Sequence, residues 1–339
     1  MKRLEMNLGE RSYGITVGKG ALDMAGELLG LDRKVFILTD VGVPKEYAEK
    51  IKSQAREARI FTVGEGEKSK SFEVLESVLT AMLDFDMSRG DALVSVGGGV
   101  VGDLGGFAAS IYMRGIDFYN VPTTLLSQVD SSIGGKTAIN LNGVKNTIGA
   151  FYQPKAVLID TETLKTLPKR QILSGLAESI KMALTSDEEL FALLTAEGLT
   201  EENTETLILR SLMIKKSVVE CDERESGLRK ILNFGHTLGH GIESAEEMSG
   251  LYHGECVALG MIPMCSPELR EKVKGLLSRV GLPTKYEGNI DAALDFVTHD
   301  KKCRGGMVEA IFVDTPGSYR IEKLSLDDFS KIIKDAITE

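Results

Sequence analysis

The order of periodic segments along the chain constrains its fold more than any other feature of the sequence. Short apolar runs rich in β-branched residues alternate with segments of helical period through the first half of the chain. The apolar runs cover residues 35–38, 58–63, 92–96, 118–121 and 156–159, and residues 72–85 form one of the helical segments between them. Strands that alternate with helices predict an α/β domain with a mostly parallel sheet.

The spacing of apolar residues along the sequence changes near residues 167–168 and divides the chain into two parts. Beyond it, apolar residues recur at helical spacing over residues 171–184, 187–196, 203–221, 230–247 and 326–337, and hairpins are predicted over residues 4–17 and 308–324. A chain of 339 residues is long enough for two domains. We therefore predict an α/β fold with a parallel-sheet domain over residues 1–167, followed by a mainly α-helical domain over residues 168–339.

The charge balance narrows the choice of partners. The formal net charge is −10, with 40 Lys and Arg against 50 Asp and Glu, which disfavours binding to nucleic acid. The sequence has no apolar run of 18 residues that could cross a bilayer, and Lys2 and Arg3 stand where a secretory signal would become apolar. We therefore expect a cytoplasmic protein with no nucleic-acid or membrane partner.

A glycine cluster follows the apolar run at residues 92–96. It has the pattern GGGxxGD, from Gly97 to Asp103, and leads into a predicted helix. Backbone N–H groups without neighbouring Cβ atoms can approach a pyrophosphate at a helix N-terminus. The pattern differs from the usual GxGxxG, and a tight turn that packs the helix closely on the strand is the alternative interpretation.

Three charged residues at other strand ends could reach the same crevice. Asp40 ends a predicted strand, where a ribose-hydroxyl acceptor lies in dinucleotide-binding folds. Glu67 and Lys70 follow the next strand. A helix cap for Asp40 and a solvated turn for the other two remain the simpler alternatives.

Three of the four histidines of the chain cluster at His236, His240 and His253. On a helix, His236 and His240 would share a face with about 5–6 Å between their Cβ atoms. Two ligands of one zinc ion can span that separation. The alternative is a set of histidines that are simply satisfied in the core or on the surface.

Several further motifs carry a family resemblance. They lie at residues 113–115, 122–126, 130–136, 145–146, 176–181, 222–229, 232–240 and 253–255. Together, from about residue 13 to residue 313, they resemble the 3-dehydroquinate synthase family. The resemblance implies an N-terminal Rossmann-like domain, a helical C-terminal domain and an active site in the cleft between them. It also implies NAD⁺ and one divalent metal, zinc or cobalt.

The implied reaction converts 3-deoxy-D-arabino-heptulosonate 7-phosphate into 3-dehydroquinate and phosphate, in the shikimate pathway. Transient oxidation by NAD⁺ precedes phosphate elimination, re-reduction, ring opening and aldol closure. The partner is thus a small sugar acid phosphate. Arg114 matches a residue that reaches the phosphate site of a neighbouring subunit, which implies a homodimer.

Site residues follow from the resemblance motif by motif. The metal ligands are Glu178, His236 and His253, so His240 would face substrate rather than metal. The implied catalytic and substrate-pocket residues are His240, Asn233, Lys181, Lys215, Arg229, Asp130, Lys136, Asn146 and Arg114, with a lysine among residues 300–302. The implied NAD contacts are Asp40, Glu65, Gly66, Glu67, Lys68, Ser69, Lys70, Gly99, Val100, Val101, Gly102, Asp103, Thr123, Thr124, Lys136, Lys145, Thr163, Leu164, Lys165 and Thr166.

We expect His240, with Asn233 beside it on one helix, to relay the proton of the substrate C5 hydroxyl, since an imidazole exchanges protons near neutral pH. The segment between residues 261 and 281 is shorter than we expect for a member of this family. It has Pro263 and Pro267 where a helix would otherwise continue. The alternatives are another sugar phosphate cyclase, a metal-dependent polyol dehydrogenase, or a binding module that senses metal or nucleotide.

Overall fold

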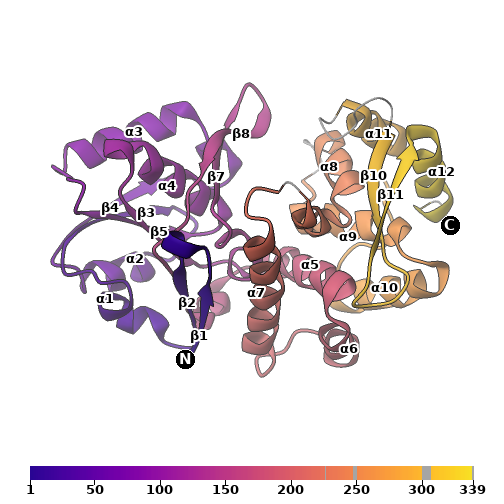
Figure 1. The fold of residues 1–339 in the computed structure, drawn as a ribbon, viewed down its shortest axis with the longest axis horizontal. Helices are drawn as coiled ribbons and strands as arrows, with labels where there is room; N and C mark the ends of the chain where they lie inside the picture. The colour runs from indigo at the N-terminus through magenta and orange to yellow at the C-terminus, as the bar shows by residue number, and fades with distance from the viewer. Residues whose placement is uncertain (226, 247–249, 300–306, 338–339) are drawn as a thin grey trace. The chain divides into compact units, whose positions relative to one another are not determined.

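The computed structural model describes residues 1–225, 227–246, 250–299 and 307–337 (Figure 1). Contacts between residues divide the chain into two compact units, Met1–Pro168 and Lys169–Glu339. Among the described residues, no helix combines the length and the apolarity that crossing a membrane would need.

The first unit is built on a seven-stranded sheet in the order β1-β2-β9-β6-β5-β3-β4. Only β1 and β2 pair antiparallel, as the predicted N-terminal hairpin, and the remaining neighbours pair in parallel. The strands are β1 (Lys2–Met6), β2 (Tyr13–Val17), β3 (Lys34–Asp40), β4 (Glu57–Val63), β5 (Ala92–Gly97), β6 (Asp117–Pro122) and β9 (Ala156–Ile159). The prediction of a mostly parallel sheet is confirmed.

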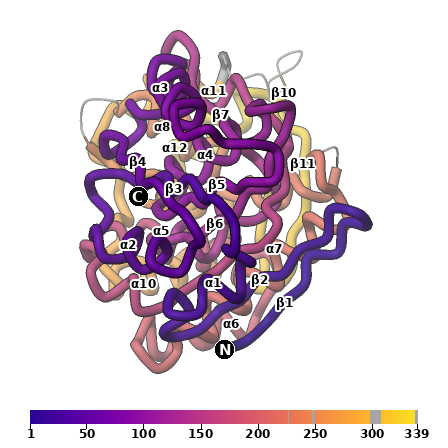
Figure 2. Tube along the Cα trace, turned by 90° about the vertical axis from the view of Figure 1, so that its left-hand side faces the viewer, coloured from indigo at the N-terminus to yellow at the C-terminus, as the bar shows by residue number. Residues whose placement is uncertain are grey.

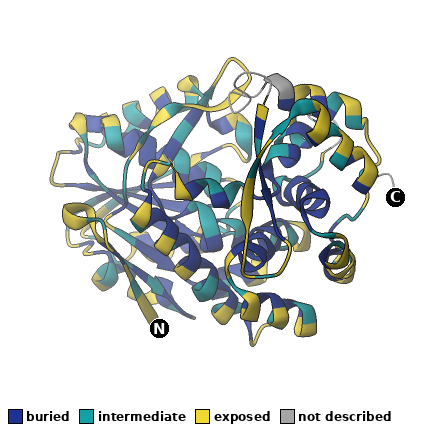
Figure 3. Ribbon diagram, turned by 45° about the vertical axis from the view of Figure 1, so that its right-hand side comes forward, coloured by how far each residue is buried: buried dark blue, intermediate teal, exposed yellow. Residues whose placement is uncertain are grey.

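Helices cover both faces of this sheet, as Figure 2 shows for α3 and α4 on one side and α1 and α2 on the other. The alternation of side chains along β3 explains the two cores: Phe36 and Leu38 pack against α3 and α4, whereas Val35 and Ile37 pack on the opposite face. The helices are α1 (Ala25–Leu28), α2 (Lys45–Lys52), α3 (Phe72–Leu83) and α4 (Gly99–Ile111). The central strands are therefore buried (Figure 3).

A second hairpin, β7 (Lys136–Leu141) and β8 (Val144–Phe151), forms a separate two-stranded sheet. The sequence interpretation took residues 130–146 only as a binding surface. An Asn142-Gly143 pair between two alternating runs is a strong hairpin signal, because both residues adopt the positive φ angles that a tight turn needs, here 50° and 77°. This hairpin packs on α4 and on α3.

The second unit is mainly helical, as predicted. Its helices are α5 (Lys169–Ser186), α6 (Glu188–Glu197), α7 (Thr204–Cys221), α8 (His236–Ala245), α9 (His253–Met261), α10 (Pro267–Val280), α11 (Ile290–His299) and α12 (Leu326–Ile337). The predicted late hairpin is β10 (Met307–Phe312) with β11 (Arg320–Ser325). Helix α8 packs on α9 and α11, and α5 packs on α9.

The helix predicted over residues 230–247 is observed only from His236 to Ala245, so the prediction is wrong at its start. A 3₁₀ turn covers Leu228–Asn233, and α8 begins only at His236. Gly235 separates them with a left-handed φ of 74°, and a Cβ there would lie 2.7 Å from Met261 Cγ and 2.9 Å from Val257 O. The break therefore comes from close packing against α9, which helical periodicity cannot report.

Candidate active site

The parallel strands of the first unit end at a common edge, where the glycine cluster lies. Strand β5 ends at Gly97 and α4 begins at Gly99. A Cβ at Gly97 would lie 2.6 Å from Val101 Cγ2, and a Cβ at Gly105 would lie 2.0 Å from Ser95 Oγ. These glycines let α4 approach the sheet, so close packing accounts for part of the motif. The N-terminus of α4 remains available as a place for a phosphate.

Lys70 joins three segments beside this helix. Its side chain is 3% exposed, and its Nζ lies 2.6 Å from Asp103 Oδ2 on α4. The same Nζ donates a hydrogen bond to Asn146 Oδ1 on β8. The Asn140 backbone N–H donates to Lys70 O (2.8 Å), and the Asn140 amide donates to Glu67 Oε1 (2.8 Å). The predicted residues Glu67, Lys70, Asp103 and Asn146 are thus brought together.

Asp40 is buried at the end of β3 and forms a local cap. Its Oδ1 accepts a hydrogen bond from the Gly42 N–H at 2.8 Å. Burial raises the pKa of Asp40, the Gly42 hydrogen bond opposes this, and the neighbouring Glu65 carboxylate raises it further. A Cβ at Gly42 would lie 2.9 Å from Glu65 Cδ, so the two carboxyl groups flank one turn.

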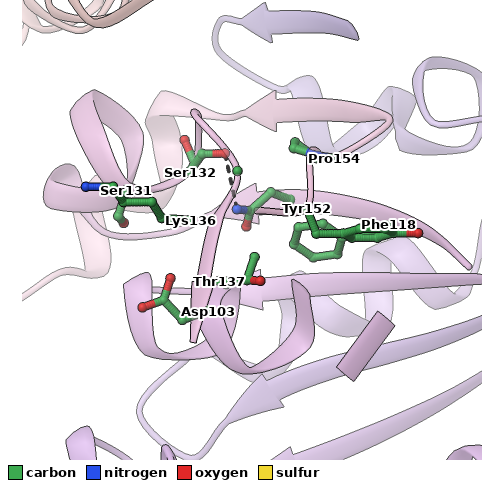
Figure 4. Close-up of a pocket in the computed structure, with 11 residues that line it drawn as sticks. Asp103, Phe118, Ser131, Ser132, Lys136, Thr137, Tyr152 and Pro154 are labelled. Carbon is green, nitrogen blue, oxygen red and sulfur yellow. Dashed lines mark hydrogen bonds between the residues drawn. The ribbon is translucent and has the colours of Figure 1, made fainter. Parts of the chain in front are cut away.

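A polar pocket adjoins the glycine helix (Figure 4). Asp103 and Lys136 line it together with Asn120 on β6, Ser131 and Ser132. Asn120 Oδ1 and both serine Oγ atoms are buried without a hydrogen bond. The sequence interpretation missed Asn120, although a buried amide in an otherwise apolar strand is itself a signal, because such groups normally need a partner.

The other predicted residues of this unit are distributed along the same chain segments. Thr123 is buried, and the Thr124 Oγ1 accepts from the Ser127 N–H at 3.2 Å. Thr163 Oγ1 accepts from Gln128 Nε2 at 3.0 Å, so that hydroxyl already has an internal role. Lys145 is exposed on β8, and Asp130 is half-buried. Lys165 forms an ion pair with Glu162, and the Thr166 hydroxyl is hydrogen-bonded to that of Tyr47. Arg114 adopts a left-handed φ of 67°.

In the second unit, Glu178, His236 and His253 converge. Glu178 is fully buried on α5, and the two histidines are the first residues of α8 and α9. Glu178 Oε1 lies 3.6 Å from His236 Nε2 and 3.4 Å from His253 Nε2. One donor atom of each residue lies within 4.8 Å of the others. This spacing suits one small cation bound by two imidazoles and one carboxylate.

The outer nitrogens of both imidazoles are also engaged. His236 Nδ1 lies 3.1 Å from Phe234 O, and His253 Nδ1 lies 3.0 Å from Glu243 Oε2. When each Nδ1 donates its proton outward, both Nε2 atoms face the Glu178 carboxylate, and a cation bound there would take the neutral Nδ1–H tautomer of each ring. This tautomer is the one that metal-binding histidines of this kind require.

The charges around Glu178 keep it ionised. Burial alone would raise its pKa, but Lys181, whose Nζ lies 2.5 Å from Glu178 Oε2, and His253 together hold that pKa well below its usual range. Burial, helped by the Lys181 charge, lowers the pKa of His236. Burial would also lower the pKa of His253, but Glu178 and Glu243 outweigh it and raise that pKa to about 10.

The fit to a divalent cation can be judged from Glu178 itself. Its Oε2 is paired with Lys181, whereas its Oε1 is buried and faces both Nε2 atoms without a hydrogen bond of good geometry. A buried carboxylate normally has such partners, or else a metal in their place. The donor set of one carboxylate oxygen and two imidazole nitrogens, with the His253 ring losing its extra proton when a cation binds, is therefore suited to zinc or cobalt.

His240 lies one turn after His236 on α8, with ring centroids 5.2 Å apart. It belongs to a different set of convergent donors in the described residues, formed with Glu243 and His253. The inference from spacing alone, that His236 and His240 would share one ion, therefore does not describe the set that includes Glu178.

Among the described residues of this unit, the buried lysine and arginine side chains are Lys181, Lys215 and Arg229. Lys181 Nζ donates to Leu232 O at 2.7 Å, and the Arg229 backbone N–H donates to Asp222 Oδ2 at 3.0 Å. Buried cations at this density suit an anionic ligand.

Asn233 was expected beside His240 on one helix. The structure instead places it at the end of the 3₁₀ turn that precedes α8. Its amide donates to Glu225 Oε1 at 2.9 Å. The lysine expected among residues 300–302 lies outside the described residues.

The start of α9 is fastened to α5. Arg170 donates two hydrogen bonds of 2.7 Å to Glu255 and lies 4.2 Å from the ring centroid of Tyr252. A Cβ at Gly254 would lie 2.1 Å from Ser174 O. The His-Gly-Glu motif thus combines a ligand candidate, a close backbone approach and an anchor. The sequence analysis used all three residues for the family resemblance but assigned a role only to the histidine.

Comparison with known proteins covers nearly the whole chain. The family models described as 3-dehydroquinate synthase N-terminal and 3-dehydroquinate synthase C-terminal match residues 60–174 and 175–303. The 3-dehydroquinate synthase of Streptococcus mutans is 39% identical over 98% of this chain and 99% of that protein. The 3-dehydroquinate synthase of Clostridium beijerinckii is also 39% identical, over 97% of this chain and 100% of that protein.

Solved structures show the same fold. A 2-deoxy-scyllo-inosose synthase in complex with carbaglucose-6-phosphate, NAD⁺ and Co²⁺ has a TM-score of 0.88 at 25% identity, over 99% of this chain and 100% of the other. A 2-epi-5-epi-valiolone synthase from Streptomyces hygroscopicus with NAD⁺ and Zn²⁺ has a TM-score of 0.88 at 26% identity, over 98% and 97%. A probable glycerol dehydrogenase from Sinorhizobium meliloti shares the fold at a TM-score of 0.65, 19% identity, and 96% of both chains.

Proposed function

The chain belongs to the 3-dehydroquinate synthase family, and on that premise we propose that it converts 3-deoxy-D-arabino-heptulosonate 7-phosphate into 3-dehydroquinate and phosphate. It would be a carbon–oxygen lyase of the shikimate pathway. The observation that carries the proposal is the convergence of Glu178, His236 and His253 on one possible metal site. A glycine-rich helix start suited to a dinucleotide gives further support.

Two cofactors belong to the proposal: NAD and one divalent metal, zinc or cobalt, as in the inosose and valiolone synthases. Glu178, His236 and His253 would hold the metal, and the edge formed by the 99–103 helix start, Asp40 and Lys70 would hold NAD. When bound, the metal would acidify a substrate hydroxyl and NAD⁺ would take up and return a hydride, so no net redox change results. Residues 1–167 would thus serve NAD, and residues 168–339 metal and substrate.

The side chains of the chain itself would do three things for the substrate. Lys181, Lys215 and Arg229 would neutralise its carboxylate and phosphate, which an acidic protein must do with concentrated local charge. Lys136, Asp130 and Asn146 would orient the sugar. His240 would exchange the proton of the C5 hydroxyl, since its ring lies beside those of His236 and His253, with centroids 5.2 and 6.0 Å away.

We also propose a cytoplasmic homodimer. Support comes from Arg114, which follows Met113 in a left-handed conformation, with φ angles of 67° and 50°. Two consecutive non-glycine residues in this conformation are strained, and such strain persists where a site depends on it. In the family resemblance, the residue matching Arg114 reaches the phosphate site of the neighbouring subunit.

The test supplies heptulosonate phosphate with Zn²⁺ or Co²⁺ and substoichiometric NAD⁺, and follows orthophosphate and dehydroquinate. We expect many turnovers per NAD⁺ and no lasting absorbance at 340 nm. A polyol dehydrogenase would instead accumulate NADH, and another cyclase would turn over a different sugar phosphate in place of the acid. The His240→Ala variant should bind metal normally but turn over about 10²–10⁴-fold more slowly, and near-normal turnover would remove His240 from the proton transfer.

A further inference from the structure

Glu243 contacts a ligand candidate from the side opposite to the site. His253 lies between two carboxylates, with Nε2 3.4 Å from Glu178 Oε1 and Nδ1 3.0 Å from Glu243 Oε2. The other imidazole, His236, has a backbone carbonyl in the corresponding outer place. Only one of the two histidines therefore has an outer partner that a single side-chain substitution can remove.

The location of Glu243 follows from the geometry of α8. His236, His240 and Glu243 stand at positions i, i+4 and i+7, so they share one face of the helix. Helix α8 packs on α9, and His253 is the first residue of α9. The Glu243 side chain is 21% exposed and that of His253 is 30% exposed, so their hydrogen bond is partly shielded from water. Glu243 thus joins α8 to the start of α9 at the ligand itself.

We infer that Glu243 is the positioning residue of the metal centre: by accepting the Nδ1–H of His253, it fixes the ring and the tautomer that present Nε2 beside Glu178 and His236. This inference rests on the proposed function, because it takes the Nε2 side as the place of the cation. A carboxylate behind a ligating imidazole both orients the ring and increases its basicity.

One competing role for Glu243 has to be separated from this one. Glu243 also converges with His240 and His253, so it could itself be a ligand of a second cation. Because Nε2 is assigned to the first ion, a second ion would have to use His253 Nδ1 as a lone pair, whereas the positioning role needs that nitrogen as a donor. The two roles therefore exclude each other at this nitrogen, and they predict different numbers of bound ions.

The test measures Co²⁺ binding to the metal-free full-length protein, by competition with a chelator and by the visible absorption of the bound ion. Wild-type protein should bind one tight Co²⁺ per chain. Glu243→Ala should weaken this affinity about 10- to 100-fold and change the absorption spectrum. Glu243→Gln keeps an acceptor for the Nδ1–H but loses the charge, so its affinity should lie between the two.

Glu246→Gln is the matched control. Glu246 caps the same helix and accepts a hydrogen bond from Tyr286 at 2.6 Å. Its substitution makes the same chemical change one turn away, so Co²⁺ affinity and spectrum should stay as in wild type. Thermal unfolding of all variants shows whether each is folded when binding is measured.

The outcomes distinguish the inference from the function beneath it. If wild type binds no Co²⁺, the metal centre and this inference both fail. If wild type binds one ion and a folded Glu243→Ala or Glu243→Gln binds it equally well with the same spectrum, Glu243 does not position His253. If two ions bind and only the second is lost in Glu243→Gln, then Glu243 is a ligand and the inference is overturned.

Discussion

Gly254 offers a quantitative test of how closely the cluster geometry depends on helix packing. This residue directly follows His253, and its N–H donates to Ser174 Oγ at 3.1 Å. In the Gly254→Ala variant, the new Cβ would lie 2.1 Å from Ser174 O and 2.6 Å from Ser174 Cα. The atoms in the way belong to the backbone of α5, which also carries Glu178, so no side-chain rotation can relieve the contact.

The size of the effect follows from that distance. Contacts of a Cβ below 3.0 Å essentially do not occur, so the start of α9 must move by at least about 0.9 Å relative to α5. Ligand distances in a metal site tolerate only about ±0.2 Å. We therefore expect Gly254→Ala to lose at least about tenfold in Co²⁺ affinity. The overpacking itself should cost about 1–3 kcal/mol of stability.

The assay combines Co²⁺ titration of the metal-free protein with thermal unfolding, where each kcal/mol corresponds to about 2–4 °C in Tm for a unit of this size. Gly275→Ala is the matched control, because Gly275 lies inside α10 and a Cβ there meets nothing within 4 Å. It should raise stability by about 0.5–1 kcal/mol through helix propensity and leave Co²⁺ affinity unchanged. A Gly254→Ala protein with wild-type Co²⁺ affinity would refute the reasoning.

Two further predictions concern ion pairs in different parts of the chain. Lys70→Met removes the 2.6 Å ion pair with Asp103 and should lower the stability of the fold by about 1–3 kcal/mol. It should also weaken NAD⁺ binding, measured by calorimetric titration. Unchanged NAD⁺ affinity would exclude Lys70 from the nucleotide site. Asp187→Asn keeps a helix cap but loses the charge opposite Arg210. Burial opposes ionisation of Asp187, but the hydrogen bond and charge of Arg210 outweigh it and lower the Asp187 pKa. The ion pair therefore stabilises the fold fully above about pH 4. This stabilisation disappears as the pH falls through the lowered pKa. Denaturant titrations should show wild type about 1 kcal/mol more stable at pH 7, and a gap that did not begin to narrow below about pH 4 would contradict the assignment.

The regular parts of the fold could be predicted because their signals are local. Alternation along residues 13–17, the continuous apolar run at residues 92–96 and helical spacing along residues 171–184 report burial directly. Each matches an observed strand or helix, namely β2, β5 and α5. The glycine cluster was likewise correctly placed between a strand and a helix.

The parts that escaped prediction depend on contacts between distant segments. The start of α8 is set by Gly235 against Val257 and Met261, more than twenty residues away in the chain. Asn233 was misplaced for that reason. Glu243 gave no signal of its own, because a glutamate on a helix is ordinarily solvated. Its contact with His253 appears only when α8 and α9 are packed together.

Two of the three proposed ligands stand at the beginnings of helices, and this has a consequence for how the chain tolerates changes in length. Helix α9 extends from His253 to Met261, so its far end lies about 12 Å from the imidazole. The pairing of His253 with Glu178 therefore does not depend on the number of residues beyond Met261. If residues 261–281 are shorter than the family pattern, as the sequence analysis predicts, that difference lies at the end of α9 that does not carry the donor atom.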